Sequence, residues 1–212
     1  MKVPMHHLPH LQRRQWGRLW GLRALALVSA AGLAGCASTL PPRLYALRTE
    51  RPGGAPLPPA TPGPVLLLQA VTLPELLDRE ALLVPAGAAG VQPLSGHRWA
   101  EPLRDAVPRL LRHDLSLLLG ADQVWATPLP PGVAVQRLLR VELLTLLASA
   151  DQTRVLLQAR VTLLPAAGAA PAVVQLLRAE APAAGGSADA LAQAHREVLW
   201  QLAEAVALLA RR

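Results

Sequence analysis

The 212-residue chain contains no phenylalanine, one tyrosine and one lysine. Proteins that bind nucleic acids place basic side chains on the phosphates and aromatic rings on the bases. A chain in which aromatic residues make up only 3% lacks that inventory. We therefore expect no nucleic-acid partner, although the formal net charge is +7.

Acidic residues are missing from the first 49 positions, and this absence accounts for the charge. Five basic residues lie within the first 23 positions: Lys2, Arg13, Arg14, Arg18 and Arg23. The rest of the chain has 16 basic residues against 14 acidic ones, a net charge of +2. Because 52% of the residues are hydrophobic, the chain can bury a core, and its length favours one domain.

Cysteine occurs once, at Cys36, so no disulfide can form within the chain. The basic residues 1–23 and the uncharged, apolar or small residues 24–35 precede it, in the order of a secretory signal peptide. As a helix, residues 24–35 would span about 18 Å, less than the ~30 Å hydrocarbon core of a bilayer. We therefore predict that this segment is removed and is not a permanent membrane span.

Residues 33–36 read L-A-G-C, which resembles the lipobox of bacterial lipoproteins at every position. In that family the cysteine sulfur carries diacylglycerol, the peptide is cut before the cysteine, and the new amino group is acylated. The resemblance implies that residues 1–35 are a removed signal peptide and that Cys36 carries diacylglycerol and an N-acyl chain. Several acyl chains hold a protein stably at a membrane. A free cysteine at the end of an apolar run is the alternative.

Ala37 follows Cys36, and by the same resemblance it favours the periplasmic face of the outer membrane, whereas Asp would favour the inner membrane. Residues 36–42 are the predicted lipidated tether, and the six residues after the cysteine reach at most ~20 Å. The folded domain should therefore lie close to the bilayer. The pair Arg13 and Arg14 leaves both Sec and Tat export open.

Residues 43–212 are predicted to form a single α+β domain, in which a mixed, largely antiparallel sheet is packed by two amphipathic helices. We expect strands at residues 43–49, 65–73, 81–84 and 123–127, and loops at 51–63 and 87–90. Period-two alternation predicts half-buried strands over 135–147 and 154–163, joined by a turn at 149–152, and residues 173–179 complete a three-stranded meander. The predicted buried faces carry Val135, Leu139, Val141, Leu143 and Leu147 on the first of these strands, and Val155, Leu157, Ala159, Val161 and Leu163 on the second.

Two segments have the apolar spacing of amphipathic helices. The first covers residues 100–119, with Pro102 in its first turn, an expected kink at Pro108 and a C-cap at Gly120. Its apolar face is predicted to carry Leu103, Val107, Leu110, Leu111, Leu117 and Leu118. The second helix follows an N-cap at Ser187. Its predicted inner face carries Leu191, Ala194, Val198, Leu202, Ala205, Val206 and Leu209.

The common catalytic motifs are missing from the mature sequence, which has no G-x-S-x-G elbow, no Walker loop and no G-x-G-x-x-G. We therefore predict no catalytic, cofactor-binding or metal-binding residues and no enzymatic activity. His97, Glu101 and Asp105 have i, i+4, i+8 spacing, but Pro102 lies between them. A solvated helix entrance is favoured over a metal site there.

Two residues depart from the helical patterns. Asp114 lies in the middle of the first apolar face, so its carboxylate needs a partner. An arginine or backbone partner from a neighbouring segment is the favoured explanation, and a functional acid is the alternative. Trp200 lies opposite the inner face of the second helix. We predict either that its exposed ring contacts a partner protein or that a loop or second layer covers it.

Three segments resemble the family of ABC-type transport auxiliary lipoproteins. V-T-L-P-E-L-L-D-R at 71–79 and R-W-A-E-P-L-R-D-A-V-P-R-L-L at 98–111, followed by D-L-S-L-L-L-G at 114–120, are similar to its signature blocks. L-Y-A-L at 44–47 is similar to its Y-Y-x-L start, with Leu44 in place of the first aromatic residue. The meander and the C-terminal helix match only in pattern.

The resemblance implies an outer-membrane lipoprotein, without assigned catalytic residues, that is accessory to an importer-like ABC system moving lipids between two membranes. Its implied partners are the permease and ATPase of that system, a periplasmic MCE-domain subunit and outer-membrane lipid. A solitary lipid-binding lipoprotein or a periplasmic hydrolase is the alternative. The sequence leaves open the transported lipid, the docking surface and the oligomeric state, a homo-oligomer included.

Overall fold

The computed structural model describes residues 41–212 except 55, 57–58 and 169–170. The predicted signal peptide, the lipobox and Cys36 lie outside the described residues. Pro42–Arg212 separates as one compact unit. No helix in the described part of the chain is long and apolar enough to cross a bilayer.

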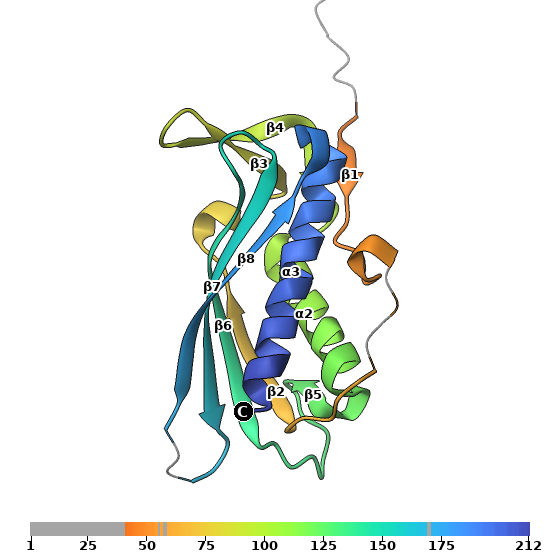
Figure 1. Ribbon diagram of the computed structural model, residues 1–212, viewed down its shortest axis with the longest axis vertical. Coiled ribbons are helices and arrows are strands. Elements are labelled where there is room, and N and C mark those ends of the chain that lie inside the picture. The colour runs from red at the N-terminus through yellow and green to blue at the C-terminus, as the bar shows by residue number, and fades with distance from the viewer. Residues whose placement is uncertain (1–40, 55, 57–58, 169–170) are drawn as a thin grey trace, which may run out of the picture. The chain divides into compact units, whose positions relative to one another are not determined.

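Within these residues the chain forms eight strands, two long helices and four short 3₁₀ turns (Figure 1). The strands are β1 (Arg43–Tyr45), β2 (Leu66–Thr72), β3 (Ala81–Ala86), β4 (Gly90–Trp99), β5 (Val124–Ala126), β6 (Arg137–Ala148), β7 (Arg154–Pro165) and β8 (Val173–Pro182). The helices are α2 (Leu103–Leu119) and α3 (Ala188–Ala210), and the turns are η1 (Pro52–Gly54), η2 (Glu75–Leu77), η3 (Ala121–Gln123) and η4 (Ala184–Gly186).

The strands form two mixed sheets. The larger sheet has the order β5-β2-β6-β7-β8, in which β2 is parallel to β5 and β6 and the remaining pairs are antiparallel. The smaller sheet has the order β1-β4-β3. In the larger sheet, α2 packs on β2 and β5, and α3 packs on β6, β7 and β8. The predicted α+β class and the β6-β7-β8 meander are confirmed.

The strand β4 is an element that the sequence did not predict. Its ten residues include Gly90, Pro93 and Gly96, and nine of the ten are exposed or half-buried. Glycine and proline interrupt the alternation that marks a strand, so the segment has no period-two signal. It is recognised only from its pairing with β3 and β1.

A register shift between Leu143 and Thr145 reverses the buried face of β6 in its second half. An extra residue in one strand turns the following side chains to the opposite side of the sheet. As a result Leu146 is 1% exposed and fills the core, whereas Leu147 is only half-buried. The prediction that Leu147 lies on the buried face is therefore wrong. On β7 all five predicted core residues are buried.

Helix α2 starts three residues later than predicted, because Pro102 has a ψ of 137° and is its N-cap. The helix continues through Pro108 to Leu119. Its buried face differs from the prediction. Leu115, which was not predicted, is fully buried, and Leu117, which was predicted on this face, is only half-buried. At its end the Gly120 N–H donates to the Ser116 carbonyl over 3.0 Å.

Helix α3 is buried around most of its circumference, with 15 of its 23 residues buried. The sheet covers one side of it and α2 covers another. The predicted inner face is buried except for Ala205, which is half-buried. Ser187 caps the helix as predicted, because its hydroxyl accepts a hydrogen bond from the Ala190 N–H over 3.2 Å.

Candidate functional site

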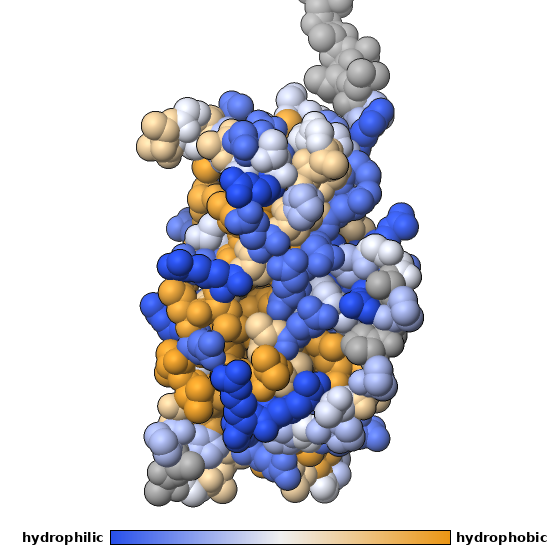
Figure 2. Space-filling model, viewed as in Figure 1, coloured by the Kyte–Doolittle hydropathy of each residue, from blue (hydrophilic) through white to orange (hydrophobic). Residues whose placement is uncertain are grey.

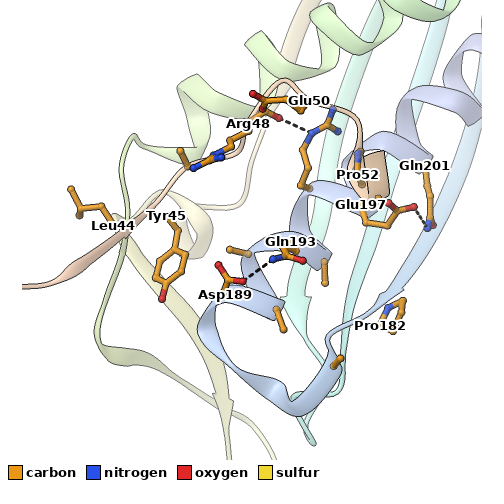
Figure 3. Close-up of a pocket in the computed structure, with 17 residues that line it drawn as sticks. Leu44, Tyr45, Arg48, Glu50, Pro52, Pro182, Asp189, Gln193, Glu197 and Gln201 are labelled. Carbon is orange, nitrogen blue, oxygen red and sulfur yellow. Dashed lines mark hydrogen bonds between the residues drawn. The ribbon is translucent and has the colours of Figure 1, made fainter. Parts of the chain in front are cut away.

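An open groove of about 920 Å³ lies between α3 and residues 43–54, which we call the N-terminal strap (Figure 3). The strap consists of β1, the extended residues after it and η1. From the strap the groove is lined mainly by Leu44, Tyr45, Arg48 and Glu50, and from α3 by Asp189, Gln193, Glu197 and Gln201. Its volume is that of a site for a small ligand or a peptide segment.

Hydrogen bonds along α3 hold the polar side chains of the groove. The Gln193 amide donates to Asp189 over 2.7 Å, and the Gln201 amide donates to Glu197 over 3.2 Å, as Figure 3 shows. Such pairs, four residues apart, are neighbours on one face of a helix. The amides therefore order two carboxylates that face the groove.

Arg196 fastens the strap to the helices. Its Nε donates to the Arg48 carbonyl over 2.7 Å, and its Nη2 lies 3.4 Å from the Thr49 carbonyl. The same guanidinium donates to both carboxylate oxygens of Asp114 on α2, over 2.9 and 2.8 Å. One side chain of α3 therefore joins α2 and the strap.

The carboxylate of Asp114 is 0% exposed, and the arginine partner predicted for it is Arg196. Burial raises the pKa of Asp114 to about 6, because removal from water outweighs the opposing charge and hydrogen bonds of Arg196. Asp114 does not line the groove. Its contacts give it a structural role in this part of the chain.

Trp200 is 2% exposed, so the prediction that its ring is free to contact a partner is wrong. The strap covers it, as in the second of the two predicted possibilities: the Arg51 guanidinium lies 5.1 Å from the ring centroid. The indole N–H donates to Glu204 over 2.8 Å, and Arg51 lies 3.9 Å from the same carboxylate. A helical wheel compares positions on one helix and carries no information about a strap from residues 43–54.

His97, Glu101 and Asp105, near the start of α2, each contact a different residue rather than a common centre. The Nδ1 of His97 lies 2.9 Å from the Tyr45 hydroxyl. Glu101 forms an ion pair with Arg109, and Asp105 lies 3.8 Å from Arg104. In the described ranges, no three or more His, Cys, Asp or Glu residues come together as a metal site would require.

His195 is a buried histidine on α3, outside the groove. It is 3% exposed, its Nδ1 lies 2.7 Å from the Leu191 carbonyl, and its ring meets Trp99 edge-on with centroids 5.1 Å apart. Burial lowers the pKa of His195 to about 4. A neutral, enclosed imidazole cannot exchange protons with a ligand in the groove.

The polar lining of the groove consists of carboxylates, amides, arginines and one phenol. Among its described lining residues, Tyr45 carries the only hydroxyl, and none is serine, threonine, cysteine or histidine. This lining therefore lacks the pair of a serine, threonine or cysteine nucleophile with a histidine base. The carboxylates and amides can form hydrogen bonds with a peptide or a polar headgroup.

Sequence reasoning missed two residues that organise this region, Arg196 and Arg51. The sequence contained a signal for Arg196. Asp114, on the apolar face of one predicted helix, required a cation, and Arg196 is an arginine on the other predicted helix. For Arg51 there is none, since it stands in a proline- and glycine-rich loop.

A family model described as "ABC-type transport auxiliary lipoprotein component" matches residues 45–207. The fold is similar to that of a solved structure called "uncharacterized protein", with a TM-score of 0.59 and 16% identity over 80% of this chain and 99% of that one. Protein XCC0632 from Xanthomonas campestris is similar as well, with a TM-score of 0.59 and 16% identity over 78% of this chain and 92% of that one. No curated protein matches the chain.

Proposed function

The chain belongs to the family of ABC-type transport auxiliary lipoprotein components, and we propose that it is the membrane-anchored docking subunit of such a system. In this proposal Cys36 carries the lipid, and the domain lies on the periplasmic face of the outer membrane. The transport system contains a periplasmic MCE-domain subunit, a permease and an ATPase, and it moves lipids between the two membranes.

The observation that carries the proposal is the family match, which covers nearly all of the folded domain. The lipobox L-A-G-C and the short tether after Cys36 support anchoring close to a membrane. The hydrogen-bonding and apolar residues that line the groove support a binding role. Ala37 supports the choice of the outer membrane.

Co-purification tests the docking role. The full-length, lipidated chain is extracted in mild detergent after expression with the permease, ATPase and MCE-domain subunits of its transport system. We expect the four proteins to elute together in size-exclusion chromatography. Elution of the lipoprotein alone, under conditions that keep the other subunits together, would overturn the docking role.

Membrane fractionation tests the location separately. On a sucrose density gradient the wild-type chain is expected with outer-membrane porins, and the Ala37→Asp variant is expected with inner-membrane proteins. The Ala37→Ser variant is the matched control and should remain with the outer membrane. Wild-type protein in the inner-membrane fraction would contradict the assignment.

The groove favours a second candidate function, a lipoprotein that binds lipid by itself. Its apolar rim includes Leu44, which is 63% exposed and lies only eight residues after the proposed lipid attachment site. Native mass spectrometry of the lipidated chain, purified without the transport subunits, tests this function. One bound phospholipid per chain in addition to the covalent acyl groups would support it over docking.

A further inference from the structure

Strand β8 is a long, open edge of the larger sheet. It is the last strand in the order β5-β2-β6-β7-β8 and pairs only with β7 among the described residues. Its ten residues therefore present a row of backbone N–H and C=O groups away from β7. Unpaired edge groups of this kind can pair with a further strand.

The other three sheet edges are short or interrupted. Strands β5 and β1 have three residues each. Strand β3 has six, and Pro85 lies among them. A proline has no N–H to donate, and a short strand can form only a few backbone hydrogen bonds with an added strand. In the described domain β8 alone is suited to strand addition.

The side chains of β8 are apolar and exposed at the start of the strand. Val173 is 41%, Val174 60% and Leu176 47% exposed, and residues 173–177 carry no charge. Figure 2 shows apolar side chains gathered where β7 and the start of β8 lie, in the part of the domain remote from β1. Protein edges are commonly protected by charges or prolines, which this half of β8 lacks.

We propose that β8 docks a β-strand of the transport system's periplasmic subunit, which adds to the larger sheet beside residues 173–177. The edge hydrogen-bonding groups require an extended polypeptide, because neither a helix nor an acyl chain can pair with them. The uncharged valines and leucine require apolar side chains on the added strand. This inference rests on the proposed function, since it takes the partner from the same system.

The direction of β8 argues against a second copy of the chain as the occupant. Pro182, at its end, lines the groove together with Leu44 of β1, so β8 runs toward the membrane tether. Two copies of β8 paired about a two-fold axis are antiparallel, and their tethers leave at opposite ends. Ten strand residues span about 33 Å, whereas the six residues 37–42 reach about 20 Å at most. Such a pair with its strands perpendicular to the membrane therefore leaves one of its two tethers out of reach of the bilayer.

The location of the apolar residues agrees with a partner that arrives from the periplasm. Val173 is at the end of β8 remote from the groove and the strap. If the strap, which follows the tether in the chain, faces its own membrane, residues 173–177 face away from that membrane and toward a subunit that reaches across from the other one.

Hydrogen–deuterium exchange tests the added strand directly. Exchange is measured by mass spectrometry on the full-length lipidated chain in detergent, alone and in complex with the permease, ATPase and MCE-domain subunits. We expect the β8 amides to exchange about tenfold or more slowly in the complex, because new hydrogen bonds protect them. The β4 amides are the internal reference and should not change.

A double variant tests whether the apolar side chains contribute. Val174→Lys with Leu176→Lys places charge on exposed positions of the edge, and it should reduce co-purification about tenfold or more without loss of folding. Val91→Lys is the matched control, because Val91 is a strand valine with 37% exposure on the other sheet. This control should co-purify like the wild type.

The outcomes separate the inference from the proposed function. Failure of the wild-type chain to co-purify overturns both. A complex that forms with unchanged exchange at β8 overturns the added strand and leaves the docking function intact, whatever the lysine variant does. Protection of β8 in the isolated chain, together with the mass of a dimer, overturns the inference in favour of a second copy.

Discussion

Arg196 and Asp114 form a two-point ion pair although 82 residues separate them in sequence. Asp114 lies on α2 and Arg196 on α3, so the pair joins the two helices. Both side chains are buried, so both charges are shielded from water. A second set of hydrogen bonds leads from the same guanidinium to the strap.

Removal of Arg196 should destabilise the domain strongly. Arg196→Met leaves a buried carboxylate without its cation, and the loss of one partner of a buried ion pair costs about 3–5 kcal/mol. The free energy of unfolding is measured by urea titration of residues 38–212, expressed without the signal peptide and Cys36. The double variant Arg196→Met with Asp114→Leu should recover part of the loss, and a double variant as unstable as the single one would show that the charge is not the cause.

The stability of the domain should depend on pH through His195. Its pKa is about 4 in the folded domain and ordinarily 6.5, so the unfolded chain binds more protons between these values. The free energy of unfolding should therefore fall, by up to about 3 kcal/mol, as the pH decreases from 6.5 to 4. Asp114 acts in the opposite sense, because its raised pKa stabilises the fold at low pH and this contribution is lost as the pH rises through about 6.

Two variants separate these opposing contributions in urea titrations at pH 4.5 and pH 7. His195→Gln should show less loss of stability in acid than the wild type, and Asp114→Asn should show more. The slope with pH, rather than the absolute stability, is the quantity to compare, because both substitutions disturb packing. An unchanged slope in His195→Gln would rule out the buried imidazole as the acid-sensitive group.

Trp200→Ala should lower the free energy of unfolding far more than a substitution at an exposed position would. Truncation of a buried tryptophan costs about 3–5 kcal/mol. Arg51→Ala removes the cation over the ring and its contact with Glu204, and it should cost about 1 kcal/mol or less, since these contacts are partly exposed. Thermal unfolding followed by circular dichroism compares the two. Equal, small shifts in Tm would contradict the burial of the ring beneath the strap.

The register shift in β6 predicts unequal effects of two adjacent leucines. Leu146→Ala should lower the free energy of unfolding by about 2–5 kcal/mol, because the side chain fills the core. Leu147→Ala, at a half-buried position, should cost clearly less. A regular strand without the shift would give the reverse order, so this pair of variants, measured by urea titration, tests the shift itself.

Cys36→Ala should abolish lipid attachment. The variant is expected to accumulate as an uncleaved precursor, because in the proposed lipoprotein Cys36 is both the acceptor of diacylglycerol and the residue before which the peptide is cut. Metabolic labelling with a radioactive fatty acid measures the attachment, and the wild-type chain is the positive control. Incorporation of label into the variant would exclude Cys36 as the attachment site.

Local patterns predicted most of the fold, and contacts between distant segments explain the errors. The alternation in β7 identified five core residues because that strand is regular and one of its faces is buried. The same reasoning misplaced Leu147, because a register shift adds one residue and reverses the face. Strand β4 has no local pattern and exists through its pairing with neighbours.

For the candidate site, the cost of burying a charge predicted more reliably than the position of a residue on a helical wheel. A buried carboxylate at Asp114 required a partner, and the buried Arg196 is that partner. The polarity of positions around Trp200 was misleading, because a single segment from a distant part of the chain covers it. The groove itself could not be predicted, since it arises between the strap and α3, which are more than 130 residues apart in the sequence.

The strap also determines how mechanical force reaches the domain. Any tension between the proposed lipid anchor and the folded body must pass through residues 43–54, because this segment joins them. β1 is held by three residue pairs with β4, and Arg196 holds the next few residues to both long helices. A pull from the proposed anchor is therefore shared between the smaller sheet, through β1, and the two long helices, through Arg196. The force enters the domain at two places at once, so neither β1 nor the Arg196 side chain carries it alone.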